Sequence, residues 1–165
     1  MIKIYKLGKI SLTQQIYNIN NKIDLENHYK KLNIEFEIFS YNKDLYRNLN
    51  RYDIAITRSG ASALAELAFF NIPFIAIPFP YSKDNHQEKN ALILAESGGS
   101  ILMNQNKISK EVFEETLERI FKIKLKNGKN QYEILDLMKK NMENNNKIKS
   151  KIEIKKFFNY FLKEL

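Results

Sequence analysis

Hydrophobic and polar positions follow two different periods along the first two thirds of the chain. Some segments place apolar side chains at every second position or in short unbroken runs, which is typical of strands. Others repeat their apolar positions every three to four residues, which is typical of helices. The predicted strands are 34–40, 53–57, 73–78 and 100–104. The predicted helices are 24–32, 41–52, 59–70 and 84–96.

This alternation of strands and helices predicts βαβ units around a parallel sheet. The expected fold class is therefore α/β, with a Rossmann-like parallel sheet and flanking helices. In such folds ligands bind at the carboxyl ends of the strands, so the loops that follow the strands are the places to look for a site.

The pattern becomes purely helical after Lys107. Residues 109–123 and 130–142 predict amphipathic helices, and the polar stretch 143–151 predicts a hinge or linker. A last helix carries an apolar stripe formed by Ile154, Phe157, Phe158, Phe161 and Leu165. We therefore expect an incomplete Rossmann-like domain at residues 1–145 and a C-terminal amphipathic helix at residues 146–165.

Composition narrows the function classes. With 165 residues and 44% hydrophobic content the chain can bury the core of one domain. It has no cysteine and only two histidines, so we expect neither a metal site nor a cofactor. No run approaches the roughly 20 apolar residues of a membrane span, which predicts a cytoplasmic protein.

The chain is basic, with a net charge of +8 and a pI near 9.4, which favours an anionic partner. An A/T-rich genome would explain the abundance of Lys and Asn equally well, so the charge does not choose between partners. Because no aromatic-basic repeat or known recognition module is present, we do not expect nucleic acid binding.

The first candidate site is the junction of the strand at 53–57 with the following helix. Arg58, Ser59, Gly60, Ala61 and Ser62 occupy it, and Ser59 and Ser62 are candidate helix caps. Free backbone N–H groups at a helix start attract anions, and small residues let a phosphate approach. Two turns beyond Ser59, the Glu66 carboxylate can accept hydrogen bonds from both ribose hydroxyls. The alternative, that Ser59 only caps and Glu66 is only solvated, stays open.

The second candidate site follows the strand at 73–78. Asp84 and Gln87 have the spacing of a capping box, which by itself predicts helix initiation. His86, Gln87 and Asn90 are spaced to converge on one patch, and amides suit sugar hydroxyls because they both donate and accept hydrogen bonds.

Taken together, these motifs resemble the donor-binding half of the MurG family. These bacterial peptidoglycan glycosyltransferases move N-acetylglucosamine from UDP-GlcNAc onto lipid I and so form lipid II. The resemblance covers most of the chain from about residue 10 and rests on the order and spacing of the motifs. They are Arg58-Ser59-Gly60-Ala61, Ala65-Glu66-Leu67, Pro73, Pro78, Asp84-Asn85-His86-Gln87 and Asn90-Ala91.

The resemblance implies the C-terminal domain of a two-domain GT-B glycosyltransferase, truncated at its N-terminus. By position Glu66 would bind the ribose, and Ala61 and Ser62 would offer backbone amides to the donor. His86, Gln87 and Asn90 would contact the diphosphate and the GlcNAc hydroxyls. The expected substrate-binding residues are Arg58, Ser59, Gly60, Ala61, Ser62, Glu66, His86, Gln87 and Asn90.

Two family features are missing: the glycine-rich loop with the proposed catalytic histidine, and the loop that grips the diphosphate. The catalytic residue is therefore unknown. We expect a UDP-GlcNAc-binding part that needs a missing N-terminal domain or a separate subunit to bind lipid I. The alternative is a non-catalytic or decayed fragment that binds UDP-sugar weakly or not at all.

Lysines surround the apolar stripe of the last predicted helix. An apolar stripe on a terminal helix is usually core, so we expect the stripe itself to be mostly buried in the core or at a domain junction. The lysines around it predict weak, salt-sensitive adhesion to an anionic membrane, and hence a peripheral position on the inner face of the cell membrane.

Overall fold

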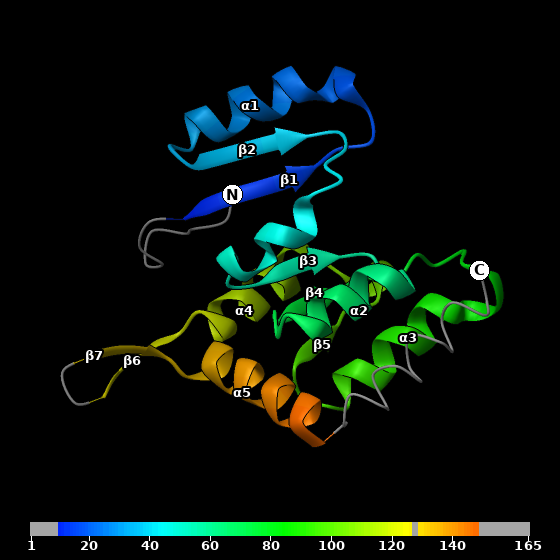
Figure 1. Ribbon diagram of the computed structural model, residues 1–165. Helices are drawn as coiled ribbons and strands as arrows, with labels where there is room; N and C mark the ends of the chain where they lie inside the picture. The colour runs from blue at the N-terminus through cyan, green and yellow to red at the C-terminus, as the bar shows by residue number, and fades with distance from the viewer. Residues whose placement is uncertain (1–9, 127–128, 149–165) are drawn as a thin grey trace. The chain divides into compact units, whose positions relative to one another are not determined.

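A computed structural model describes residues 10–126 and 129–148 of the chain (Figure 1). The chain divides into two compact units, Met1–Tyr46 and Arg47–Leu165. Three small sheets are present in the described residues: a parallel pair in the first unit, and a parallel triplet and an antiparallel pair in the second.

The first unit is a βαβ arrangement. Strand β1 (Ser11–Gln15) pairs in parallel with β2 (Glu35–Phe39), and they are connected by the short 3-10 helix η1 (Ile19–Asn21) and helix α1 (Lys22–Lys31). The helix and β2 confirm the sequence prediction, whereas β1 was not predicted.

Tyr29 attaches α1 to the strands of the first unit. Its ring lies 5.5 Å from that of Phe36, and its hydroxyl donates a hydrogen bond of 2.5 Å to Gln14 Oε1. Partial burial of the phenol raises the pKa of Tyr29.

The predicted helix at 41–52 is wrong in type, because the structure has a 3-10 helix, η2 (Leu45–Arg51). The residues before it already form a side-chain turn, in which Asn42 Oδ1 accepts a hydrogen bond of 2.9 Å from the Asp44 amide. Asn and Asp side chains compete for backbone groups in this way and so disfavour a regular α-helix.

The second unit contains the expected parallel sheet. Strands β3 (Ala55–Thr57), β4 (Phe74–Ala76) and β5 (Ser100–Leu102) are hydrogen-bonded in that order, and both pairs are parallel. Helix α2 (Ala61–Phe69) connects β3 to β4, and α3 (His86–Ala95) connects β4 to β5, with α2 and α3 in contact. The prediction of a parallel sheet with flanking helices is confirmed.

The central strand β4 is buried on both faces of this sheet. Phe74, Ile75 and Ala76 are all fully buried, and successive side chains of a strand point to opposite faces. Ile75 belongs to a core cluster with Met103, with Ile120 from α4 (Lys110–Ile120), and with two residues of α5 (Glu133–Ile148). Helices α4 and α5 therefore cover one face.

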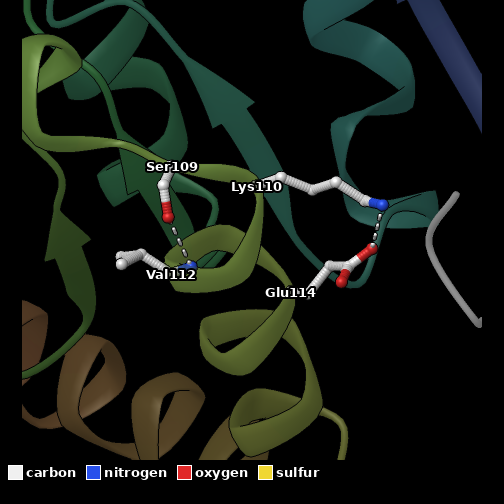
Figure 2. A network of polar contacts seen from close by, with 4 residues as sticks. All are labelled: Ser109, Lys110, Val112 and Glu114. Carbon is white, nitrogen blue, oxygen red and sulfur yellow. Dashed lines mark hydrogen bonds and ion pairs between the residues drawn. The ribbon is translucent and has the colours of Figure 1, made fainter.

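Helix α4 begins at a well-formed cap. Ser109 Oγ accepts a hydrogen bond of 3.2 Å from the Val112 amide, and Lys110 Nζ lies 3.9 Å from Glu114 Oε1 one turn along (Figure 2). Hydrogen bonds from its own amide and from the Ser109 hydroxyl lower the pKa of the Glu111 carboxyl. The capping serine therefore stabilises the start of this helix locally.

The region between α4 and α5 differs from the prediction. The helix expected to reach residue 123 ends at Ile120, and strands β6 (Ile123–Lys126) and β7 (Lys129–Tyr132) form an antiparallel hairpin. The helix expected from residue 130 therefore begins only at Glu133. Residues 143–148, expected to act as a hinge or linker, continue α5 instead.

Helix α5 packs closely against the end of α3. Asn141 Nδ2 donates a hydrogen bond of 3.1 Å to the Gly98 carbonyl, and Asn145 Nδ2 donates one of 3.1 Å to the Ser97 carbonyl. Gly98 has a φ of 74°, as in the expected glycine stop of a helix. A Cβ on Gly99 would lie 2.2 Å from Met142 Cγ, so this glycine is required for close approach.

We expect Gly99→Ala to lower the free energy of unfolding by about 1–3 kcal/mol, because Met142 must leave its buried position to admit the methyl group. Urea unfolding followed by circular dichroism measures the change. Gly60→Ala is the matched control, since nothing lies within 4 Å of a Cβ at that position. Equal midpoints for Gly99→Ala and Gly60→Ala would contradict the close packing of α5.

All non-glycine residues with positive φ in the described part of the chain are Asn or Asp. Asn33 follows α1 and Asn71 follows α2, whereas Asp84 and Asn85 precede α3. These are the residue types that tolerate the left-handed region best after glycine. These three turns are therefore built without glycine, unlike the turn at Gly98.

Most of the C-terminal helix expected at 146–165 lies outside the described residues, and residues 146–148 continue α5, so the domain boundary expected at residue 145 stays a prediction. No helix within residues 10–126 and 129–148 is long and apolar enough to cross a membrane.

Candidate functional site

The junction of β3 and α2 has the expected form but a different cap. Gly60 is the N-cap residue, with φ −65° and ψ 137°, and no side chain caps this helix. The prediction that Ser59 caps α2 is wrong, because Ser59 lies one residue earlier and is fully buried, and its Oγ makes no hydrogen bond to any described residue. Its position before the cap prevents the hydroxyl from serving the first turn.

The N-terminus of α2 is open for an anion. Its first intrahelical bond runs from the Leu64 amide to the Gly60 carbonyl, so the amides of Ala61, Ser62 and Ala63 have no partner within the helix. Ser62 and Glu66 are exposed and lie one turn apart on the same face of α2. This face therefore presents backbone donors, a hydroxyl and a carboxylate in succession.

The start of α3 also differs from the predicted capping box. Asp84 and Asn85 adopt left-handed backbone conformations, with φ 51° and 54°, and neither residue caps the helix with its side chain. Gln87 is used elsewhere: its Oε1 accepts a hydrogen bond of 3.0 Å from the Phe79 amide. Two consecutive left-handed residues store strain, and such strain tends to occur at functional sites.

His86 is exposed at the first position of α3. Its Nδ1 lies 2.6 Å from the Lys83 carbonyl. Because a carbonyl only accepts, this contact assigns a proton to Nδ1 and leaves Nε2 of the neutral ring as an acceptor.

Asn90 brings the two candidate sites together. Its Nδ2 donates a hydrogen bond of 3.4 Å to the Ser59 carbonyl, just before α2. The structure thus joins Ser59 and Asn90, and Gln87 lies on the same helix as Asn90. Within the described residues no side-chain hydrogen bond joins Glu66 or His86 to that group.

Arg58 reaches the loops that follow the next two strands. Its Nη1 donates to the carbonyls of Ile77 and Pro78, both at 3.3 Å, and to Gln105 Oε1 at 2.6 Å. The guanidinium carbon lies 5.8 Å from the centroid of the Phe79 ring, within the range of a cation–π contact.

Sequence reasoning missed Gln105. The signal was available, since Gln105 comes shortly after β5, at the carboxyl end of the third parallel strand. Gln105 and Arg58 both line an open depression of about 470 Å³. Its other lining residues are Ile56, Thr57, Ile77 and Ile108.

The described residues contain no group of three or more His, Cys, Asp or Glu side chains placed to hold a metal ion. The polar groups at the two junctions are helix N-termini, side-chain amides, hydroxyls, the Arg58 guanidinium, the His86 imidazole and the exposed carboxylates of Glu66 and Asp84.

The fold and these junctions define a Rossmann-like domain of the GT-B glycosyltransferase type, with polar groups gathered at the carboxyl ends of parallel strands. Residues 4–153 match the family described as glycosyltransferase family 28 C-terminal domain, and the chain belongs to that family.

Curated relatives confirm the resemblance to the MurG family. One, from Prochlorococcus marinus (strain MIT 9301), is a UDP-N-acetylglucosamine–N-acetylmuramyl-(pentapeptide) pyrophosphoryl-undecaprenol N-acetylglucosamine transferase. It is 62% identical over 151 residues, which cover 92% of this chain and 39% of the relative. A protein of the same name from Pelagibacter ubique (strain HTCC1062) is 40% identical over 117 residues, covering 71% of this chain and 32% of its own length.

A solved structure supports the fold. MurG from Acinetobacter baumannii superposes with a TM-score of 0.67 at 18% identity, covering 82% of this chain and 37% of that one. The matched region spans 39% and 32% of the lengths of the two curated relatives, so this chain corresponds to well under half of either one.

Proposed function

We propose that this chain is the donor-binding part of a transferase that adds N-acetylglucosamine from UDP-GlcNAc to lipid I. The observation that carries the proposal is the hydrogen bond from Asn90 to the Ser59 carbonyl. It places the amide-bearing start of α3 beside the open N-terminus of α2, so that a sugar and a diphosphate can be bound together.

The proposed roles follow from the chemistry of each group. The amides of Ala61 and Ser62, assisted by the helix dipole, bind diphosphate oxygens. The exposed carboxylate of Glu66 accepts hydrogen bonds from the ribose hydroxyls. His86 and Asn90 bind the GlcNAc hydroxyls or the diphosphate.

The remaining motif residues shape the site. Gly60 lets a phosphate approach the backbone, and the bond from the Phe79 amide to Gln87 Oε1 leaves the Gln87 amide nitrogen to donate to the ligand. During transfer the same positive end of α2 stabilises the charge that develops on the departing UDP. A base that activates the acceptor hydroxyl is not among these residues.

We infer the acceptor and the place of the reaction from the lipid that appears in the names of the relatives. The acceptor in their name carries a pyrophosphoryl-undecaprenol group, and a polyprenol tail lies in a membrane. We therefore place the reaction at the inner membrane face, with lipid I bound by a further domain or subunit.

Isothermal titration calorimetry of the full chain with UDP-GlcNAc tests donor binding. We expect saturable binding of UDP-GlcNAc and of UDP, and much weaker binding of uridine at the same concentrations. Uridine is the matched control because it carries the same ribose and base without the diphosphate that the N-terminus of α2 is proposed to bind. The absence of UDP-GlcNAc binding by a folded sample would refute the proposed function.

A further inference from the structure

The loops after all three strands of the second unit meet at one guanidinium group. Arg58 follows β3, the carbonyls of Ile77 and Pro78 follow β4, and Gln105 follows β5. Parallel strands end at the same edge of their sheet, so a single long side chain can span these loops.

Gln105 makes the shortest of the three contacts. The distance from Arg58 Nη1 to Gln105 Oε1 is 2.6 Å, against 3.3 Å for each of the two carbonyls. The side chain of Arg58 is exposed, and holding an exposed arginine in one rotamer costs conformational entropy. The contact with Gln105 is therefore the one that offsets this cost best.

The Arg58 contacts continue into the start of α3. Arg58 donates a hydrogen bond to the carbonyl of Pro78. The nitrogen of the same peptide group, the Phe79 amide, donates to Gln87 Oε1. From the same helix Asn90 donates to the carbonyl of Ser59, which is covalently attached to Arg58. These hydrogen bonds therefore connect the start of α2 to α3 by two routes, one through Arg58 and one through Asn90.

We infer that Gln105 is a positioning residue for the donor site. It fixes the Arg58 guanidinium, which holds the loop at residues 77–79 and thereby sets the position of Gln87. The inference rests on the proposed function, because the ligand that benefits is the nucleotide sugar. It also gives Arg58, expected to contact substrate, a second role in holding the loop.

Three variants test this inference in the full chain. Gln105→Ala removes the acceptor for Arg58, whereas Gln105→Glu keeps an oxygen there and adds a charge that favours the arginine. Asn106→Ala is the matched control, because Asn106 lies next to Gln105 on the same short helix. Within the described residues its backbone amide donates to Asn104 Oδ1, and its side chain makes no hydrogen bond.

Two measurements are made on each variant. Amide exchange of Phe79, followed by NMR, reports on the loop, since the neighbouring prolines have no amide. Calorimetry gives the dissociation constant for UDP-GlcNAc. In Gln105→Ala we expect faster exchange at Phe79 and about tenfold weaker binding, with an unchanged melting temperature. Gln105→Glu and Asn106→Ala should match the unmodified chain in both measurements.

The possible failures are distinguishable. Unchanged exchange at Phe79 in Gln105→Ala would overturn the inference, as would faster exchange without any loss of affinity. An equal loss in Gln105→Glu would also overturn it, because the acceptor is still present there. If the unmodified chain binds no UDP-GlcNAc, the proposed function and the ligand role of Gln105 both fail, while the exchange of Phe79 still decides whether Gln105 holds the loop.

Discussion

Glu66→Ala is expected to weaken UDP binding by about a hundredfold. Two hydrogen bonds from ribose hydroxyls to a carboxylate contribute about 1.5 kcal/mol each, or roughly 3 kcal/mol together, and each 1.4 kcal/mol corresponds to about a tenfold change in the dissociation constant. Because Glu66 is exposed on α2, its removal should leave folding intact. Calorimetry with UDP measures the effect.

A second nucleotide makes this test specific for the ribose contact. 2′-Deoxy-UDP lacks one of the two hydroxyls, so the loss caused by Glu66→Ala should be about tenfold smaller with it than with UDP. Glu118→Ala, which removes an exposed carboxylate from α4, is the control and should bind UDP normally. Equal losses for UDP and 2′-deoxy-UDP would exclude a ribose contact by Glu66.

Phe74→Ala is expected to lower the free energy of unfolding by about 3–5 kcal/mol. Phe74 is fully buried in β4, the central strand of its sheet, so its removal leaves a cavity that two neighbouring strands prevent from closing. A domain of this size has about 5–15 kcal/mol of stability, so the variant should lose a large part of it. Urea unfolding of the purified chain measures the loss.

Phe69→Ala is the matched comparison, because Phe69 is 56% exposed on α2 in the same unit. The same truncation there should change the free energy of unfolding by less than about 1 kcal/mol. Similar losses for Phe69→Ala and Phe74→Ala would mean that the sheet is not the centre of the core.

The parallel sheet could be predicted because its central strand is apolar on both faces. The run 73–78 has no polar residue to suggest an exposed face, and the structure buries all of Phe74–Ala76. Strand β1 escaped prediction because most of Ser11–Gln15 is polar, and it is only partly buried. It is a strand because it pairs with β2, and such a tertiary pairing cannot be predicted from the local sequence pattern.

The candidate site was predicted as a set of residues but not as a set of contacts. Gln87 was expected in a capping box, but its Oε1 accepts a hydrogen bond from the amide of Phe79, eight residues earlier. Ser59 was expected to cap α2, but Gly60 is the N-cap residue. A shift of one residue in the start of a helix changes which side chain faces its first turn. Gln105 lies 47 residues from Arg58, so only the fold brings them together.

The residues with positive φ determine where glycine codons of the gene can be replaced by A-rich asparagine codons. Glycine codons begin with two guanines, whereas asparagine codons begin with two adenines. Asn33, Asn71 and Asn85 hold positive φ with an A-rich codon at turns where glycine is the usual choice. Gly99 cannot follow the same route, because a Cβ there would lie 2.2 Å from Cγ of the buried Met142 of α5. Mutational pressure towards A and T can therefore remove glycine from the open turns of this domain while the packing of α5 preserves it at the end of α3.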